Sequence, residues 1–226
     1  MCIRDRSIGG YDYLRNNNGQ ILINPVSGLP LINTNFLPIG DRTPDFTMGV
    51  NNTLTYGAFS LSFLFDIRKG GDVYNGTERF LWLSGLSNKL EDRNIPYTFN
   101  GVLRDGRENS DQPTPNTIQI SPLTRTEFYS AFPESHFVER DINWIRLRDM
   151  TLAYQLPSAI LQKTKIVKEA SIYFTATELW MLTNYTGADP NVNGNSAATR
   201  GAGSAGFDFG SLSLPRSFVG GLRVRF

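Results

Sequence analysis

The last nine residues alternate between two kinds of side chain, and this pattern constrains the fold more than any other segment. One set is apolar or small and consists of Phe218, Gly220, Leu222, Val224 and Phe226, and the intervening residues from Gly221 to Arg225 are small or charged. A period of two is typical of a β-strand with two chemically different faces. A membrane β-barrel needs such strands, because lipid lies outside the wall and water inside it. The last strand of a soluble sheet shows the same alternation, so this segment leaves both architectures open.

A longer alternating pattern covers residues 45–68 and predicts a hairpin. Apolar side chains stand mostly at every second position over 46–56 and again over 59–67. Gly57 lies between the two runs, where a tight turn would join the strands. In a barrel the apolar residues of the second run would face lipid, and the lumen would be faced by Ser60, Ser62 and Asp66.

Two further strands are expected near residues 144–154 and 172–177, which makes about five in all. In the first of them, Arg146 and Arg148 fall on the same parity as Met150. The upper part of this strand therefore either rises above the membrane or contains a β-bulge.

The connections between these strands differ greatly in length. Residues 70–140 and 184–212 show no sustained periodicity beyond a possible short helix in 77–90, whereas Gly57 and 157–168 make short links. Long structureless loops are unusual in compact soluble domains. Membrane barrels, in contrast, place long loops on one side and short turns on the other. The unequal lengths favour an all-β segment of an antiparallel transmembrane barrel over a soluble sandwich.

The N-terminal part is expected to lie outside the barrel wall. Residues 1–6 lack the apolar stretch of a signal peptide and resemble translated adapter sequence, so we expect them to be non-native. Residues 7–44 are rich in Asn, Gly and Pro and predict an extracellular loop region. The barrel segment is expected to span residues 45–226.

Composition argues against several functions. The chain has 22 basic and 21 acidic residues, a net charge of +1, which gives no argument for nucleic acid as a partner. Cys2 and His136 are the only residues of their kinds, so the chain cannot form an internal disulfide or a site with several His ligands. Glu134 and Glu139 flank His136, but no nucleophile accompanies them, and we do not expect an enzyme.

The second long connection contains three motifs that resemble ligand-binding signatures. Residues 201–206 read G-x-G-x-x-G and residues 208–210 read D-F-G, but the strand, helix and further motifs that such sites need are missing. Residues 189–194 fit the start of a calcium loop, but Arg200 stands where a bidentate Glu is needed. No cofactor and no metal are therefore expected.

Aromatic residues in the first long connection leave a second function open. They would stack on sugar rings in a secreted or surface β-rich carbohydrate-binding protein, or they would form a small core of the loop, which is the simpler expectation. These residues are Trp82, Tyr97, Phe99 and Tyr129.

Four longer stretches follow one another in a characteristic order: Ile39–Phe46, Phe65–Asn75, Trp144–Tyr154 and Thr183–Pro190. Together with the final Phe226, they resemble the C-terminal end of SusC/RagA-type TonB-linked outer-membrane proteins. Candidate site residues within these motifs are Asp66, Gly70, Gly71, Arg146, Leu147, Arg148, Tyr185, Gly187, Asp189 and Pro190. The final strand resembles the signature read by the barrel-assembly machinery, at Phe218, Leu222, Val224 and Phe226.

The resemblance implies a 22-stranded outer-membrane barrel with an N-terminal plug, of which this chain would supply the C-terminal strands. Such transporters import oligosaccharides or peptides across the outer membrane of Gram-negative bacteria. They work with a SusD-type surface lipoprotein and draw energy from the TonB complex through an N-terminal part that this sequence does not show. Partners implied are outer-membrane lipid, the lipoprotein, the TonB complex and the assembly machinery.

Overall fold

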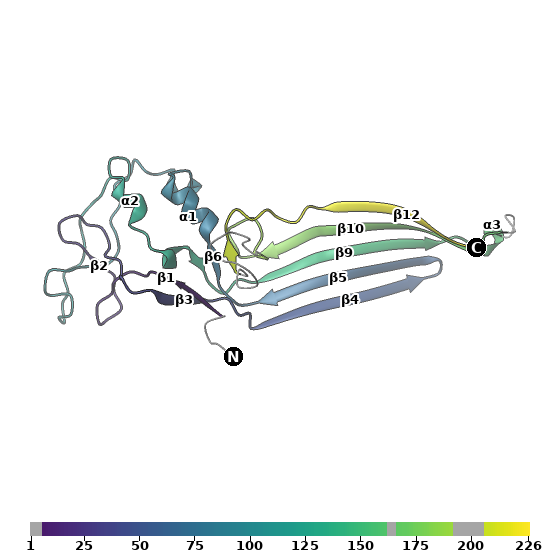
Figure 1. Cartoon of the computed structure of the whole chain (residues 1–226), viewed down its shortest axis with the longest axis horizontal. Coiled ribbons are helices and arrows are strands. Elements are labelled where there is room, and N and C mark those ends of the chain that lie inside the picture. The colour runs from purple at the N-terminus through teal and green to yellow at the C-terminus, as the bar shows by residue number, and fades with distance from the viewer. Residues whose placement is uncertain (1–5, 162–165, 192–205) are drawn as a thin grey trace. The chain divides into compact units, whose positions relative to one another are not determined.

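The structure is a computed structural model that describes residues 6–161, 166–191 and 206–226 (Figure 1). The chain forms two compact units. The sheet unit comprises Pro44–Gly71, Asp141–Pro190 and Leu212–Phe226, and the loop unit comprises Met1–Thr43, Asp72–Arg140 and Asn191–Ser211. No helix in the described part of the chain is long and apolar enough to cross a membrane.

Five antiparallel strands form the sheet unit, in the order β12-β10-β9-β5-β4 (Figure 1). They are β4 (Phe46–Tyr56), β5 (Phe59–Lys69), β9 (Trp144–Gln155), β10 (Glu169–Thr183) and β12 (Ser217–Arg225). Gly57 has a φ of 59°, which glycine adopts without steric cost, and it begins the tight turn predicted between β4 and β5. A short helix, α3 (Ser158–Leu161), opens the predicted link between β9 and β10. The expected five strands are confirmed.

Strand pairing collects apolar side chains on one face of this sheet. Residues paired directly across antiparallel strands share a face. One such row crosses four strands and consists of Leu54, Leu61, Leu152 and Phe174. The next row lies on the opposite face and consists of Thr53, Ser62, Thr151 and Thr175. The alternation predicted along the second strand of the hairpin therefore runs across four of the five strands.

A β-bulge interrupts β9 at Arg148. Leu64 of β5 pairs with Asp149, but the next residue, Phe65, pairs with Leu147, so Arg148 is an extra residue in its strand. The extra residue restores the alternation, because it turns Leu147 toward the apolar face and Arg146 toward the polar face. The predicted bulge is therefore confirmed, and it accounts for the parity of the arginines.

The facing part of β10 is irregular as well. Its pairing with β9 shifts between Thr177 and Trp180, and Glu178 between them has a φ of 51°, which is uncommon for a residue with a Cβ. Beyond the shift, β10 continues to Thr183. The strand is therefore much longer than the alternation over 172–177 indicates, because the bulges break the period that reveals a strand in sequence.

The loop unit contains short strands and helices. The strands are β1 (Ser7–Gly10), β2 (Leu22–Ile23), β3 (Leu37–Asp41), β6 (Val73–Asn75), β7 (Val102–Leu103), β8 (Val138–Glu139) and β11 (Phe207–Asp208). Among the described residues of this unit the helices are α1 (Gly76–Leu83), α2 (Glu127–Ser130) and the 3-10 helices η2 (Asn88–Leu90) and η3 (Glu134–Phe137). Helix α1 confirms the short helix expected within 77–90, and the Asn75 side chain caps it by accepting a hydrogen bond from the Glu78 N–H.

An aromatic core holds the loop unit together. Trp82 and Phe99 are buried in it, and Tyr129 packs against it. Tyr97 is 43% exposed, but its ring contacts those of Phe99 and Phe128 at centroid distances of 4.9 and 5.4 Å. The simpler expectation for these aromatic residues, a core of the loop itself, is confirmed. Long connections can lack periodicity and still fold, because irregular segments contribute single large side chains to a shared core.

Candidate functional site

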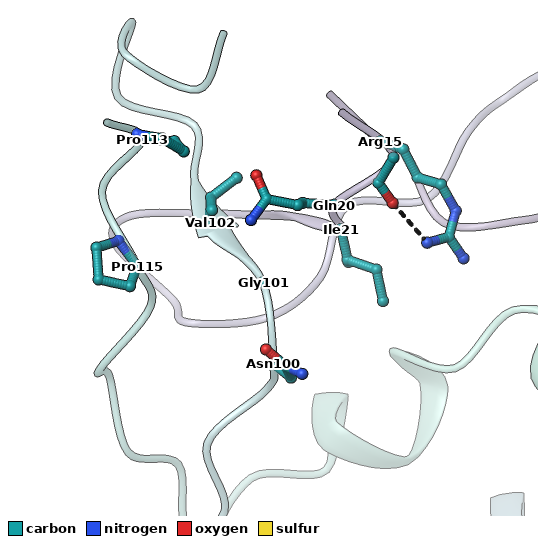
Figure 2. Close-up of a pocket in the computed structure, with 9 residues that line it drawn as sticks. Arg15, Gln20, Ile21, Asn100, Gly101, Val102, Pro113 and Pro115 are labelled. Carbon is teal, nitrogen blue, oxygen red and sulfur yellow. Dashed lines mark hydrogen bonds between the residues drawn. The ribbon is translucent and has the colours of Figure 1, made fainter. Parts of the chain in front are cut away.

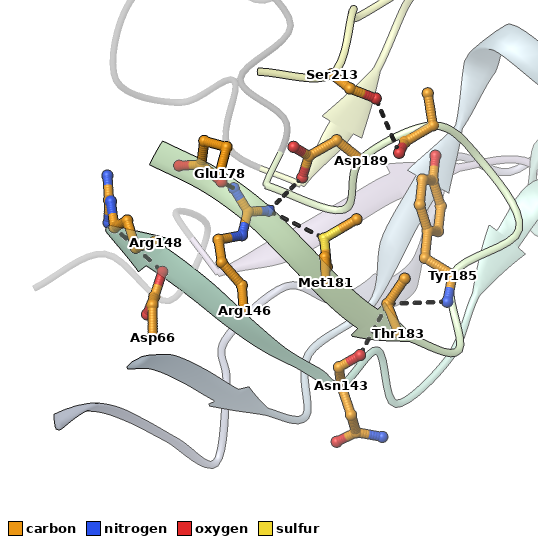
Figure 3. A network of polar contacts seen from close by, with 11 residues as sticks. Asp66, Asn143, Arg146, Arg148, Glu178, Met181, Thr183, Tyr185, Asp189 and Ser213 are labelled. Carbon is orange, nitrogen blue, oxygen red and sulfur yellow. Dashed lines mark hydrogen bonds and ion pairs between the residues drawn. The ribbon is translucent and has the colours of Figure 1, made fainter. Parts of the chain in front are cut away.

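Motif residues from three distant segments meet on the polar face of the sheet, near the end where β5 and β10 finish and β9 starts (Figure 3). The segments are the end of β5 with Gly70, the start of β9, and the end of β10 with the residues that follow it. The polar contacts among them define a cluster, here called the Arg146 cluster. Its charged members are Arg146, Glu178 and Asp189.

Arg146 is the centre of this cluster and is only 1% exposed. Its Nη2 donates to Asp189 Oδ1 at 2.6 Å and lies 3.2 Å from Met181 Sδ. Its Nη1 donates to Glu178 Oε2 at 3.3 Å. The bulged residue Glu178 therefore contributes the second carboxylate. A buried guanidinium is tolerated only with paired charges and hydrogen bonds, so these contacts explain how the chain holds Arg146 out of water.

The motif Thr183–Pro190 folds back to supply Asp189. Tyr185 is 6% exposed and Asp189 is 5% exposed. Gly187 packs so closely on the Tyr185 ring that an added Cβ would overlap it. The Ser213 hydroxyl donates to the Ala188 carbonyl at 3.1 Å. Gly187 is therefore required by close approach, while Asp189 and the buried Pro190 are core residues of the fold-back.

A second set of hydrogen bonds joins the three strand ends through Asn143. Its Oδ1 accepts from the Gly70 N–H at 3.0 Å, and its own N–H donates to Asn184 Oδ1 at 2.8 Å. The Thr183 hydroxyl donates to the Asn143 carbonyl at 2.8 Å. Asn143 is absent from the predicted site residues, because a single Asn before a strand resembles any turn residue.

The two motif glycines are needed for their backbone conformation. Gly70 and Gly71 have φ angles of 79° and 88°. A Cβ on Gly70 would also stand 2.8 Å from the Asp45 carboxyl group. Both positions therefore favour glycine for steric reasons.

The remaining motif residues lie apart from the buried contacts. Arg148 Nη1 lies 3.5 Å from Asp66 Oδ2, and the arginine side chain is 48% exposed, so this pair is a weak one. Leu147 is on the apolar face, opposite Arg146. The structure thus brings Arg146 and Asp189 into contact, buries Tyr185 and Pro190 in the fold-back, and leaves Leu147 on the opposite face.

The residues of the predicted assembly signature lie along β12 and just after it. Phe218 pairs with Ala176, Leu222 with Ile172 and Val224 with Ala170. The Phe218 ring also stacks on Phe174 with centroids 6.0 Å apart. Phe226 follows the strand and is 70% exposed.

The residues considered for catalysis or metal binding have structural partners. Glu134 pairs with Arg79 at 2.9 Å, and Glu139 accepts a hydrogen bond from Asn75 at 2.8 Å. His136 packs within an aromatic group, and burial lowers its pKa, with the charge of Lys89 adding to the effect. Within the described ranges there is no group of three or more His, Cys, Asp or Glu side chains that could hold a metal ion.

The motifs that resemble ligand-binding signatures lie partly outside the described residues. Residues 192–205 are outside, and they include the second half of the calcium-like motif and most of the glycine-rich motif. The Asp208 carboxylate of D-F-G is buried and accepts a hydrogen bond from the Thr77 hydroxyl at 2.8 Å. This carboxylate therefore anchors the loop to helix α1.

A pocket of about 480 Å³ opens in the loop unit (Figure 2). It lies where β2 and β7 pair, and Gln20, Asn100 and Pro115 are among the residues that line it. Arg15, at its edge, donates to the Gly19 carbonyl at 2.9 Å. The lining mixes amides with proline rings, and none of the predicted site residues belongs to it.

Comparison with known proteins gives relatives of one kind. No family model matches the chain. It is 32% identical over 189 residues to TonB-dependent receptor P3 of Formosa agariphila, which covers 83% of this chain and 17% of the receptor. TonB-dependent receptor P26 of the same organism is 29% identical, over 99% of this chain and 20% of that receptor. The predicted resemblance to TonB-linked receptors is confirmed.

Solved structures with the same fold come from RagAB. The structure of the RagAB peptide transporter matches 96% of this chain with a TM-score of 0.55 and 16% identity. The RagAB peptide importer in its open-open state matches 97% with a TM-score of 0.58 and 17% identity. The fold class is therefore confirmed as all-β, like the matched part of these structures. The relatives are named as receptors and the solved structures as a peptide transporter, in line with the expectation that the chain is not an enzyme.

The chain spans about a fifth of the length of the proteins it matches, 17–20% of the curated relatives and 22% of the solved chains. This partial coverage fits the expected correspondence to the C-terminal part of a SusC/RagA-type receptor.

Proposed function

We propose that this chain forms part of the wall of a TonB-dependent transporter in the outer membrane of a Gram-negative bacterium. The observation that carries the proposal is the two-sided sheet. On the apolar face, large side chains such as Phe59, Ile172 and Leu222 are 51%, 53% and 63% exposed. A continuous exposed apolar surface of this kind is unfavourable in water and suits contact with lipid.

Strand length and face chemistry support the same proposal. β4 and β5 contain 11 residues each, close to the roughly 9–11 residues that a tilted strand needs to cross a bilayer. The opposite face carries hydroxyl pairs, with Thr151 and Thr175 bonded at 2.8 Å and Thr177 and Ser217 at 2.6 Å. Hydroxyl groups of this kind suit a water-filled or plugged lumen.

The finer parts of the proposal rest on the relatives. We propose that the complete transporter imports oligosaccharides or peptides and works with a SusD-type surface lipoprotein. Coupling to the TonB complex would depend on regions of the receptor outside this chain. RagAB, which shares this fold, is a peptide transporter, and this supports peptides among the proposed substrates.

The carbohydrate-binding alternative loses its main support in the structure. Stacking on sugar rings requires exposed aromatic faces, but Trp82 and Phe99 are 9% and 5% exposed. Tyr97 is 43% exposed, and its ring packs against those of Phe99 and Phe128. These rings are used by the core of the loop unit.

The proposal is tested by measuring which face of β5 meets lipid. Nitroxide labels are attached to Leu61→Cys or to the adjacent Ser62→Cys in the full receptor, reconstituted in bilayers. We expect the label at 61 to collide with oxygen, which concentrates in lipid, and the label at 62 to collide with a water-soluble nickel chelate. Equal access of the nickel chelate to both positions would remove the barrel-wall function.

Substrate class needs a separate experiment. A strain without the receptor gene is grown on oligosaccharide mixtures or on peptide mixtures as the limiting nutrient. Loss of growth on one of the two, restored by the wild-type gene, identifies the imported class. Unchanged growth and uptake on both would contradict the import of either class.

A further inference from the structure

The apolar face contains a groove of about 510 Å³ at the end of the sheet near the Arg146 cluster. Apolar side chains line it from four neighbouring strands, and they are Phe46, Ile67, Ile145 and Leu182. Three of them form one row, since Ile67 pairs with Ile145 and Ile145 pairs with Leu182. Leu182 is 61% exposed, so the groove is open on the side away from the backbone.

A basic residue closes the apolar face at this groove. Lys69 pairs directly with Phe46, two residues beyond the pair of Ile67 and Met48. The register between β4 and β5 is continuous, so Lys69 shares the apolar face with Ile67 and Phe46. Lys69 also lines the groove. The apolar surface therefore ends at the exposed ammonium group of Lys69, beside the exposed ring of Phe46.

No ion pair within the described part of the chain neutralises Lys69. The neighbouring residue, Arg68, also lines the groove, but it has the opposite parity and its guanidinium is already held. It lies over the Trp144 ring at 4.9 Å, and its Nε donates to the Gly70 carbonyl at 3.1 Å. Lys69 is therefore the cation available to a ligand that enters the groove from the apolar face.

We propose that this groove binds one acyl chain of a lipid whose anionic headgroup is held by Lys69. The inference rests on the proposed function, because it needs the apolar face to lie in a membrane. Lysine keeps its methylene stem on apolar surface while its ammonium reaches the polar layer. Anionic headgroups attract such basic residues at the membrane surface. The row of Ile67, Ile145 and Leu182 would hold the first methylenes of the chain, just below the charge.

The test uses the full receptor in lipid nanodiscs of phosphatidylcholine mixed with phosphatidylglycerol of identical acyl chains. Native mass spectrometry counts the lipids that stay bound after mild delipidation. We expect wild-type receptor to retain one more phosphatidylglycerol than Lys69→Gln, and Lys69→Arg to retain it as the wild type does. Lys168→Gln, at the opposite end of the sheet, is the matched control and should retain it too.

The apolar half of the site has its own pair of variants. Leu182→Ser should lose the retained phosphatidylglycerol, while Ile172→Ser, a similarly exposed residue of the same face, should keep it. Equal retention by the wild type and Lys69→Gln would overturn the proposal, as would equal retention of both lipid types. A protein segment occupying the groove, seen as a cross-link from Leu182→Cys to another strand or subunit, would overturn it as well.

Failure of the inference can be distinguished from failure of the proposed function. A receptor that does not insert into nanodiscs at all contradicts the membrane-barrel function. A receptor that inserts and shows lipid contact at Leu61, but retains no lipid through Lys69, contradicts only the lipid site.

Discussion

Arg146 and Asp189 are 43 residues apart in the chain, yet their side chains meet at 2.6 Å in a buried position. Asp189 is the residue that attaches the segment after β10 to the polar face of the sheet. Glu178 supplies a second carboxylate from the bulge of β10. The cluster therefore links two irregular features, a bulge and a fold-back, through one guanidinium.

Breaking this cluster should destabilise the sheet. Arg146→Met leaves two largely buried carboxylates without their cation, which should cost about 3–5 kcal/mol. Asp189→Asn should cost less, because Glu178 still pairs with Arg146. The measurement is urea unfolding of the full receptor, followed by the heat-dependent shift of the folded barrel on gels.

The exposed pair of Arg148 and Asp66 is the matched control for that measurement. Arg148→Met should change the free energy of unfolding by no more than about 1 kcal/mol. In the double variant, Asp189→Asn should add little to Arg146→Met, since the shared interaction is already lost. Additive effects of the two changes would show that the residues are not coupled.

The loop unit should lose stability in mildly acidic solution through His136. Burial lowers its pKa below the ordinary value of 6.5, so the unfolded chain takes up a proton that the folded unit resists. Stability is therefore highest above pH 6.5 and falls as the pH drops from there toward the lowered pKa of the folded state. Limited proteolysis of the full receptor at pH 7.5 and 5.5, with cuts mapped within 84–112, measures this change.

His136→Gln removes the titrating group and is the control. It should be somewhat less stable at both pH values, because the ring contacts with Phe132 and Trp82 are lost. Its cleavage rate should depend less on pH than that of the wild type. The same pH dependence in both proteins would assign the effect to another group.

The two ends of the sheet should lie on opposite sides of the membrane. The long connections leave from the end with Lys69 and Thr183, and the short turns at Ala58 and α3 join the strands at the other end. Cysteine at Asn94 should react with an impermeant reagent on intact cells, and cysteine at Ala58 should react only after the outer membrane is opened. Gly194, in the second long connection, lies outside the described residues.

The opposite labelling pattern would reverse the proposed orientation of the barrel. Protection of Asn94 in a correctly inserted receptor would contradict an extracellular position for the first long connection.

Phe226 should be required for assembly rather than for stability. It follows β12 and is 70% exposed, so its ring contributes little packing inside the chain. Phe226→Asp should reduce the folded receptor in outer-membrane fractions, because the terminal aromatic resembles the signal read by the assembly machinery. A charge near the interface costs about 0–1 kcal/mol, too little to explain a large defect. Wild-type amounts of folded Phe226→Asp receptor would refute a role in recognition.

The two-faced sheet could be predicted from sequence because its cause is local. Each strand shows its apolar face by alternation, and Phe59 to Ile67 shows it without interruption. The turn at Gly57 was predictable for the same reason, since its position between two alternating runs leaves room only for a tight turn. The resemblance to family motifs then identified the candidate residues in the sequence, but it did not predict which of them are in contact.

The contacts of those residues depended on tertiary structure. The bulge at Arg148 changes which side Arg146 faces, and alternation alone left both a bulge and an extension above the membrane open. The aromatic residues of the long connections carry no period that would reveal a common core. Asn143 and Glu178 were not predicted as site residues, because their importance comes from partners far away in the chain. Local patterns determine the faces of strands, whereas irregular backbone and pairing between distant charges are decided only when the segments pack together.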